Sequence, residues 1–248
     1  MAAFIDLNCD LGEGGGDDVE LLSLITSANI ACGAHAGDST TMRSTVLAAQ
    51  QQGVAFGAHP SFPDREFFGR REWVLPPSEI GALVYAQVAA LHAIAINAGA
   101  RLKHVKPHGA LYNLAARDRA VADTVAEAVA RVDPSLRLYG LAGGQLLAAG
   151  RSQGLRVAAE VFADRTYQAD GTLTPRDRPG SVIVDVDDAV AQVLRLLREG
   201  RVRALTGEDV VIAADTICLH GDGVGAVVFA RELRAALHRS GVQLRAPV

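Results

Sequence analysis

Acidic and amide side chains follow one another at regular spacing near the start of this chain. Asp6, Asn8, Asp10 and Glu13 all lie in the segment DLNCDLGE. Side chains alternate between the two faces of a β-strand, so the first three share one face and the apolar residues between them share the other. The apolar face suits packing against helices. The spacing therefore predicts that the polar face points into a barrel or a cleft, where carboxylates can do acid–base chemistry.

Two further segments place a histidine just past a predicted strand end, with an aspartate a few residues later. His35 precedes Asp38 in the segment ACGAHAGD, and His59 precedes Asp64 in GAHPSFPD. An aspartate near an imidazole can orient the ring or share a ligand site with it. We expect two such pairs on adjacent strands to belong to one site.

The later strand ends also carry ionisable groups. Lys106 and His108 share a face by alternation in the segment VKPHGALYN, Glu160 lies on a later strand, and His220 follows the last one. Lys103 and Lys106 are the only lysines of the chain, which otherwise takes its positive charge from arginine. Arginine cannot replace the compact charge of an ammonium group, so a lysine in a polar cluster indicates a specific role there.

Short apolar strands alternate with helical segments and would position these groups. The predicted strands are Phe4–Cys9, Ala28–Cys32, Ala55–Ala58, Lys103–Lys106, Leu136–Leu141, Arg156–Phe162 and Ala214–Leu219. The predicted helices lie near 39–53, 76–99, 117–131, 144–153, 187–199 and 225–240. This alternation predicts a parallel sheet, and a closed barrel and an open doubly wound sheet both satisfy it. In barrels the active site lies at the carboxyl ends of the strands.

Length, charge and cysteine content limit the class of protein. The 248 residues fit one domain, 1–248, and the net charge of −4 without a basic run argues against nucleic-acid binding. Three dispersed cysteines and no signal peptide favour a reducing, cytoplasmic location. The apolar stretch Ala82–Ala100 is interpreted as a buried helix, so no membrane is expected. The polar segment Asp164–Gly180 is interpreted as a long functional loop.

Several well-known catalytic motifs are absent from the sequence. It contains no GxSxG, no GxxxxGK[ST] and no HExxH segment. The sequence still allows a site of histidine and aspartate ligands for a divalent metal, because ligands from distant strand ends show no fixed spacing in the sequence.

These strand-end segments resemble the LamB/YcsF family of bacterial 5-oxoprolinase A subunits over nearly the whole chain. The segments that carry the resemblance are DLNCDLGE (6–13), SANIACGAHAGD (27–38), GAHPSFPD (57–64), GRR (69–71), VKPHGALYN (105–113), GLAGGQL (140–146), EVFADRTYQADGTLTPR (160–176) and DTICLHGDG (215–223). The resemblance implies a seven-stranded, TIM-like (β/α) barrel related to the glycoside hydrolase and deacetylase barrels. It also implies ATP-dependent opening of 5-oxoproline to L-glutamate together with subunits B and C.

The chemistry of such a reaction suggests roles for the polar residues. Opening a lactam needs an activated carbonyl, a positioned water and a proton for the leaving nitrogen. The candidate catalytic residues are Asp10, His35, His59, Lys106, His108, Glu160 and His220. The candidate substrate-binding residues are Asp6, Asn8, Glu13, Asp38, Asp64, Arg70, Arg71, Tyr112, Asn113, Asp164, Arg165 and Asp222. We expect Asp10 or His59 to act on the water and Lys106 with His108 to stabilise charge on oxygen or phosphate.

ATP is expected to be bound and used mainly with the partner subunits, because the chain lacks a P-loop and a kinase-type glycine loop. Two other functions stay open from the sequence. One is a metal-dependent deacetylase or amidohydrolase that acts alone, and the other is a non-catalytic barrel that binds a small acid.

Overall fold

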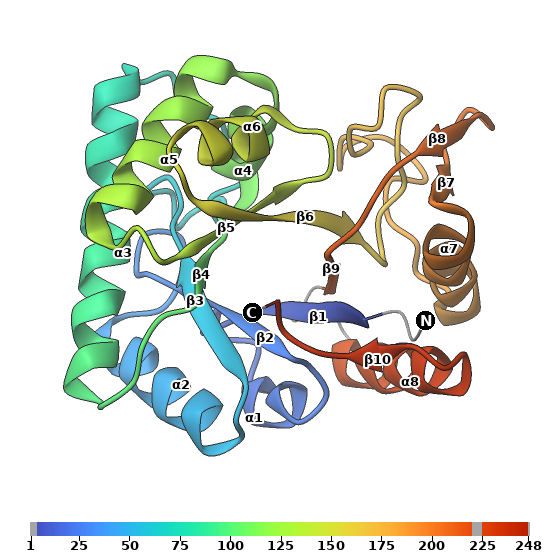
Figure 1. Ribbon diagram of the computed structural model, residues 1–248, viewed down its shortest axis with the longest axis horizontal. Helices are drawn as coiled ribbons and strands as arrows, with labels where there is room; N and C mark the ends of the chain where they lie inside the picture. Colours follow the sequence, from blue (N-terminus) through green and yellow to red (C-terminus); the bar gives the residue numbers. More distant parts are fainter. Residues whose placement is uncertain (1–3, 220–224, 248) are drawn as a thin grey trace.

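Seven parallel strands close into a barrel in which the last strand, β9, pairs with the first, β1 (Figure 1). The structure, a computed structural model, describes residues 4–219 and 225–247. The barrel strands are β1 Phe4–Leu11, β2 Ser27–Ala31, β3 Ala55–His59, β4 His104–Val105, β5 Arg137–Leu141, β6 Arg156–Phe162 and β9 Thr216–Leu219. This closure confirms the expected TIM-like (β/α) barrel and excludes an open doubly wound sheet.

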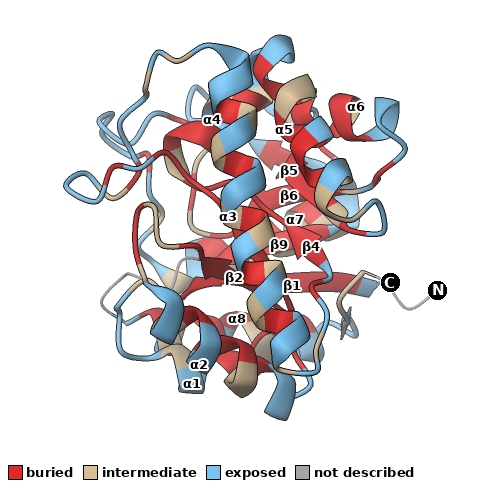
Figure 2. Ribbon diagram, turned by 90° about the vertical axis from the view of Figure 1, so that its left-hand side faces the viewer, coloured by how far each residue is buried: buried red, intermediate tan, exposed pale blue. Residues whose placement is uncertain are grey.

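Helices cover the outside of the barrel. They are α1 Asp18–Leu22, α2 Ser39–Gln51, α3 Pro77–Asn97, α4 Gly109–Arg117, α5 Arg119–Val132, α6 Gln145–Ser152, α7 Val186–Glu199 and α8 Ala226–Arg239. Figure 2 shows buried residues along the strands and exposed residues along the outer sides of the helices. The core therefore lies between helices and strands, and the interior of the barrel is left to the polar side chains.

Side-chain caps and glycines fix the ends of several helices. The Asp38 carboxylate accepts a hydrogen bond from the backbone N–H of Thr41 at the start of α2. Asp185 caps α7 in the same way, and α7 ends at Gly200, whose φ of 66° is left-handed. These contacts explain why the helices begin and end close to the predicted positions.

Some short elements were not predicted from the sequence. They are α1, α4, β7 Arg201–Arg203, β8 Asp209–Val211 and β10 Gln243–Leu244. Four of them have two to five residues, too few for a readable periodicity, whereas α4 has nine. Helix α4 begins directly after the polar strand end that carries Lys106 and His108, and the glycine at its start favours a turn in sequence. The strand β4 is also shorter than the predicted Lys103–Lys106.

Helix α3 is long and apolar enough to cross a membrane by length and composition alone. Its buried residues Ile80, Val84, Val88, Leu91 and Ala95 recur at helical spacing. Packing against the neighbouring α5 and α2 accounts for this stripe. The core helix of a globular domain meets the same criteria, so the helix is weak evidence for a membrane.

Gly57 on β3 has no room for a side chain. A Cβ atom there would lie 2.2 Å from the backbone carbonyl oxygen of His104 on β4. We expect Gly57→Ala to lower the free energy of unfolding by about 3 kcal/mol, because two paired barrel strands would have to separate. Gly81→Ala on α3 is the matched control, since its Cβ would meet the rotatable methyl group of Thr124 first. Equal denaturant midpoints for the two variants would contradict this expectation.

Candidate active site

The polar face of β1 points into the barrel, and its first member lies deepest. Asp6 accepts hydrogen bonds from the hydroxyls of Thr26 (2.6 Å), Ser27 (2.7 Å), Tyr139 (3.0 Å) and Thr216 (2.6 Å). Burial raises the pKa of Asp6, although these donors oppose the shift. With both oxygens occupied, Asp6 holds the base of the barrel together. It lies outside the wall of the cavity described below, although it was predicted to bind substrate.

A layer of amides lies above Asp6. Asn8 donates to Glu160 Oε1 (2.9 Å), and its own oxygen accepts from Asn29 Nδ2 (2.7 Å). Asn29 also donates to Asp10 Oδ1 (2.8 Å) and accepts from His104 Nε2 (2.8 Å). These bonds fix the side chains of four strands relative to one another, and they orient the carboxylate of Asp10 toward the mouth.

Lys106 is a buried cation of the site. Its Nζ lies 2.9 Å from Asp10 Oδ1, 3.0 Å from Glu160 Oε1, 3.2 Å from Asn8 Oδ1 and 2.9 Å from Cys218 Sγ. Burial lowers the pKa of Lys106, but Asp10, Cys218 and Glu160 outweigh it and hold the pKa well above its ordinary value. The three N–H bonds of the ammonium are therefore committed to these partners.

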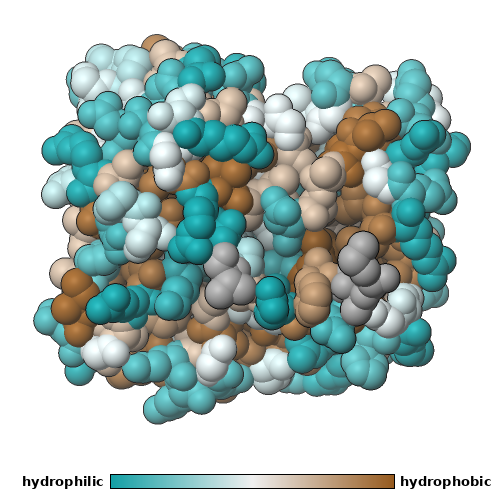
Figure 3. Space-filling view, in the orientation of Figure 1, coloured by the Kyte–Doolittle hydropathy of each residue, from teal (hydrophilic) through white to brown (hydrophobic). Residues whose placement is uncertain are grey.

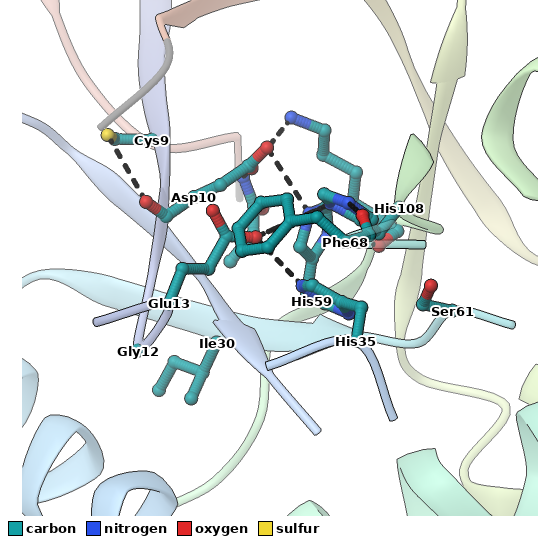
Figure 4. A network of polar contacts seen from close by, with 12 residues as sticks. Cys9, Asp10, Gly12, Glu13, Ile30, His35, His59, Ser61, Phe68 and His108 are labelled. Carbon is teal, nitrogen blue, oxygen red and sulfur yellow. Dashed lines mark hydrogen bonds and ion pairs between the residues drawn. The ribbon is translucent and has the colours of Figure 1, made fainter. Parts of the chain in front are cut away.

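Three histidines and a glutamate meet at the mouth of the barrel and form the histidine cluster (Glu13, His35, His59 and His108; Figure 4). One ligand atom from each lies within 4.8 Å of the others. His35 Nε2 is 2.8 Å from Glu13 Oε1, and the His35 ring stacks on His108 at 3.8 Å. His59 Nε2 lies 3.2 Å from Asp10 Oδ2, which joins the cluster to Lys106.

Burial favours the neutral form of two rings of this cluster, those of His35 and His108. It lowers the pKa of His35 to about 3, with a further contribution from His59. It also lowers the pKa of His108 well below the ordinary value for histidine. Neutral imidazole has a lone pair for a metal or a proton, so these rings can act as ligands or as bases.

Phe68 and Gly69 cover the cluster from the loop that follows β3. Phe68 has a φ of 55°, which is uncommon for a residue with a bulky side chain. Its ring packs edge-on against His35 and His108, each at 5.4 Å. A Cβ at Gly69 would lie 2.2 Å from Ser61 Oγ. Such strained backbone persists where the surroundings hold it in place, and it gathers at functional sites.

A cavity of about 610 Å³ opens between α4 and the segment 168–176, above Lys106 and the cluster. Figure 3 shows that the molecule is notched between the part that carries α4 to α6 and the part that carries α7, β7 and β8. The cavity is lined by Asp10, Glu13, His59, Arg70, Glu72, Lys106, His108, Tyr112, Asn113, Arg117, Arg165, Gln168, Asp170 and Arg176, among others. A carboxylate-bearing substrate would thus meet arginines at the rim and acid–base groups at the floor.

The structure brings many of the predicted residues together. The predicted residues in the cavity wall are Asp10, Glu13, His59, Arg70, Lys106, His108, Tyr112, Asn113 and Arg165. Asn8, His35 and Glu160 contact those residues from beneath or behind. His220 and Asp222 lie outside the described residues.

The two predicted histidine–aspartate pairs do not form. Asp38 caps α2, and Asp64 Oδ1 lies 3.4 Å from Arg71, whose guanidinium packs over the Phe67 ring at 4.1 Å. Asp164 also lies away from the cavity wall, and its carbonyl accepts from the N–H of Ile183. Asp38, Asp64, Arg71 and Asp164, which were predicted to bind substrate, lie outside the cavity wall. A helix cap occupies the side chain of Asp38 and an ion pair joins those of Asp64 and Arg71, while Asp10 and Glu13 near the end of β1 reach the histidines.

Some residues of the site were missed in the sequence. Asn29 and Cys218 point inward by the same alternation that identified the face of β1, so that pattern contained a signal for both. Arg117 and Arg176 line the cavity through α4 and the long loop. The role of Phe68 depends on a left-handed backbone that no local pattern indicates.

His104 makes the stability of the folded protein depend on pH. The ring stacks on Tyr139 at 4.3 Å, and burial together with the charge of Lys106 lowers the pKa of His104 to about 3. The unfolded chain protonates this ring near its ordinary pKa of about 6.5, whereas the folded protein does not. Above about pH 6.5 the ring is neutral in both states. As the pH falls from there toward the pKa of the folded state, protonation of the unfolded chain lowers the free energy of unfolding.

We expect His104 to contribute about 1.4 kcal/mol per pH unit to the loss of stability between about pH 6 and pH 4. His104→Gln keeps a donor for Asn29. It should reduce the slope of unfolding free energy against pH by about 1.4 kcal/mol per pH unit, which corresponds to one proton. Urea titrations across this range measure the slope. A slope identical to that of the wild type would mean that His104 is already charged in the folded protein.

Fold and site together define a class, a (β/α) barrel with a candidate active site at the carboxyl ends of its strands. The chain belongs to the LamB/YcsF family, whose profile matches residues 5–248. It is 56% identical over 247 residues to the A subunit of 5-oxoprolinase from Geobacillus kaustophilus (strain HTA426), an alignment that covers 98% of this chain and 96% of that protein.

Solved structures agree with this placement. The crystal structure of the lactam utilization protein from Thermus thermophilus matches with a TM-score of 0.90 and 45% identity, covering 98% of this chain and 99% of the other. The polysaccharide deacetylase Bc1974 from Bacillus cereus matches with a TM-score of 0.52 and 14% identity, covering 100% of this chain and 93% of the other. The second likeness is one of fold alone, and it agrees with the expected relation to deacetylase barrels.

Proposed function

We propose that this chain is the A subunit of an ATP-dependent 5-oxoprolinase and that it opens the 5-oxoproline lactam to L-glutamate together with subunits B and C. The observation that carries the proposal is the 56% identity, over nearly the full length, to proteins named as the A subunit of 5-oxoprolinase. Such a name implies an assembly of several chains. We place the ATP chemistry mainly on the partner subunits, because this sequence has no P-loop.

The cavity suits a small acidic amide. Its volume of about 610 Å³ is in the range of small-molecule sites, and arginines such as Arg70 and Arg176 line it together with the carboxylates of Asp10 and Glu13. An arginine can bind the substrate carboxylate, which would leave the lactam carbonyl to face the floor of the cavity. The rim would thus fix the orientation, and the floor would supply the chemistry.

Asp10 is the residue best placed to act on water. Lys106 and Asn29 hold its Oδ1, and its Oδ2 faces the mouth beside His59. In the proposed step Asp10 takes a proton from water, the oxygen bonds to the lactam carbon, and the carbon–nitrogen bond breaks. Protonated Asp10 then gives that proton to the leaving nitrogen. Phosphorylation of the amide oxygen by the partner subunits would activate the carbonyl, so breaking the carbon–nitrogen bond would leave γ-glutamyl phosphate. A second water would then hydrolyse this acyl phosphate to glutamate and inorganic phosphate.

Lys106 takes a different role from the one expected from sequence. Four acceptors lie within 3.2 Å of its Nζ, so no N–H bond is left for a substrate oxygen unless a partner is lost. We therefore propose that Lys106 is a positioning residue, which holds Asp10 ionised and in place. Stabilisation of charge on the substrate would come from the cluster and the rim instead.

A second function is favoured by one observation. The histidine cluster is the kind of site at which a metal-dependent amidohydrolase or deacetylase would act without ATP. Hydrolysis of acetylated or cyclic amides by the isolated chain with metal, and no requirement for ATP, would support that interpretation. Tight binding of a small acid without turnover in any mixture would instead support a non-catalytic barrel.

We expect the isolated chain to form no measurable glutamate from 5-oxoproline, ATP and magnesium. An unstrained amide needs activation, and the activation is proposed to come from other chains. Adding subunits B and C should restore glutamate formation in proportion to this chain. ATP-coupled turnover by the chain alone would contradict the proposal that the partner subunits carry out the ATP chemistry.

A further inference from the structure

Two backbone carbonyls determine which nitrogens of the histidine cluster carry protons. His59 Nδ1 lies 2.7 Å from the carbonyl oxygen of Lys106, and His108 Nε2 lies 2.8 Å from that of Phe68. A carbonyl oxygen can only accept, so each of these nitrogens must be the N–H donor. In a neutral ring the other nitrogen then bears a lone pair.

Those two lone pairs face each other. His59 Nε2 and His108 Nδ1 are 2.9 Å apart, a hydrogen-bond distance, although neither carries a proton in this arrangement. Glu13 Oε1 adds a negative charge at 3.4 Å from His108 Nδ1 and 3.8 Å from His59 Nε2. A cation at the centre of this set of acceptors, either a metal ion or a proton, would relieve the repulsion between its members.

We propose that the histidine cluster is a binding site for one divalent transition-metal ion of the zinc class, held by Glu13 Oε1, His59 Nε2, His108 Nδ1 and His35 Nε2. Three imidazoles and one carboxylate form a donor set that suits zinc, cobalt, manganese or iron and suits magnesium or calcium poorly. The backbone carbonyls behind His59 and His108 play the part that hydrogen-bond acceptors usually play behind metal-bound histidines.

The spacing fits a metal after small movements. Ligand bonds of about 2.0–2.1 Å in a tetrahedron place the donor atoms about 3.4 Å apart. The separations that involve Glu13 and the two facing nitrogens run from 2.8 to 3.8 Å. The carbonyl of Phe68 accepts a hydrogen bond from His108, and the Phe68 ring packs on the cluster. The left-handed backbone at Phe68 therefore positions both groups at this site.

Lys106 does not compete with this cation. It neutralises Asp10 through Oδ1 and Glu160 from below, whereas the cluster lies on the Oδ2 side of Asp10. A divalent ion at the cluster would polarise an amide oxygen or lower the pKa of a nearby water at the floor of the cavity. The inference stands on the geometry of the cluster and holds whether or not the proposed function is correct.

The test is metal binding by the tag-free, full-length chain without substrate or partner subunits. After treatment with a chelator, the chain is loaded in turn with zinc, cobalt and manganese, passed through gel filtration and measured by elemental analysis. We expect about one equivalent of zinc or cobalt, visible absorption bands of tetrahedral cobalt, and a higher melting temperature with metal.

His59→Ala and His108→Ala should each weaken binding by at least about 10²-fold and abolish the cobalt bands. His238→Ala is the matched control, because His238 is exposed on α8 far from the cluster in sequence and should bind like the wild type. Circular dichroism checks that each variant folds. If an alanine variant does not fold, metal binding by His108→Asn is measured instead. A wild-type chain that retains none of the three metals overturns the proposal, as does unchanged retention in the cluster variants.

Discussion

Replacing Lys106 by methionine is expected to lower the free energy of unfolding by about 3–5 kcal/mol. Methionine fills a similar volume, but it leaves the buried carboxylates of Asp10 and Glu160 without their shared cation. Lys106 is 2% exposed, so water cannot take its place. The loss should be visible as a large fall in the denaturant midpoint.

Lys103→Met is the matched control for this change. Lys103 is the only other lysine of the chain and is exposed, and its hydrogen bond to Phe56 comes from the backbone. Its replacement should change stability by less than about 0.5 kcal/mol. If both lysine variants unfolded at the same denaturant concentration, the ion network around Lys106 would have no net part in stability.

Asp10→Asn should reduce turnover in the reconstituted assembly by about 10²–10⁴-fold, the usual contribution of a positioned general base. The amide keeps the shape of the side chain and an oxygen for Lys106 and Asn29, so the fold should survive. It cannot take a proton from water. Steady-state rates of glutamate formation, measured with saturating subunits B and C, give the size of the effect.

Asp38→Asn is the control for the same chemical change at another place. Asparagine caps helices about as well as aspartate, and Asp38 lies at the start of α2 outside the cavity wall. This variant should keep wild-type turnover. Full activity of Asp10→Asn would remove Asp10 from the mechanism and move the base to a histidine of the cluster.

The alternation of side chains in β1 predicted correctly which residues face the barrel interior. It could not predict their depth, because Asp6 and Asp10 share a face but lie about 13 Å apart along the strand. Asp6 consequently meets the hydroxyls at the base of the barrel, while Asp10 reaches the mouth. Strand–helix alternation in the sequence fitted both a closed barrel and an open sheet. The pairing of β1 with β9 in the structure decides for the barrel.

Partners that depend on tertiary contacts escaped prediction. His35 and His59 were each given the nearest aspartate in sequence, but their carboxylate contacts are Glu13 and Asp10 on and just after β1. The strand register brings these segments together, and no local spacing encodes that contact. The carbonyl of Phe68 reaches His108 only because its backbone is left-handed, which explains why the contact of Phe68 with the cluster was not predicted from the sequence.

The most direct test of the proposed function is the rate of glutamate formation from 5-oxoproline and ATP with subunits B and C held constant. The variable is this chain, which is either absent, wild type, Asp10→Asn or Asp38→Asn. We predict turnover with the wild type and Asp38→Asn, and a rate with Asp10→Asn close to that of the mixture without the chain. Equal glutamate formation with and without this chain would contradict the proposal that the barrel opens the lactam.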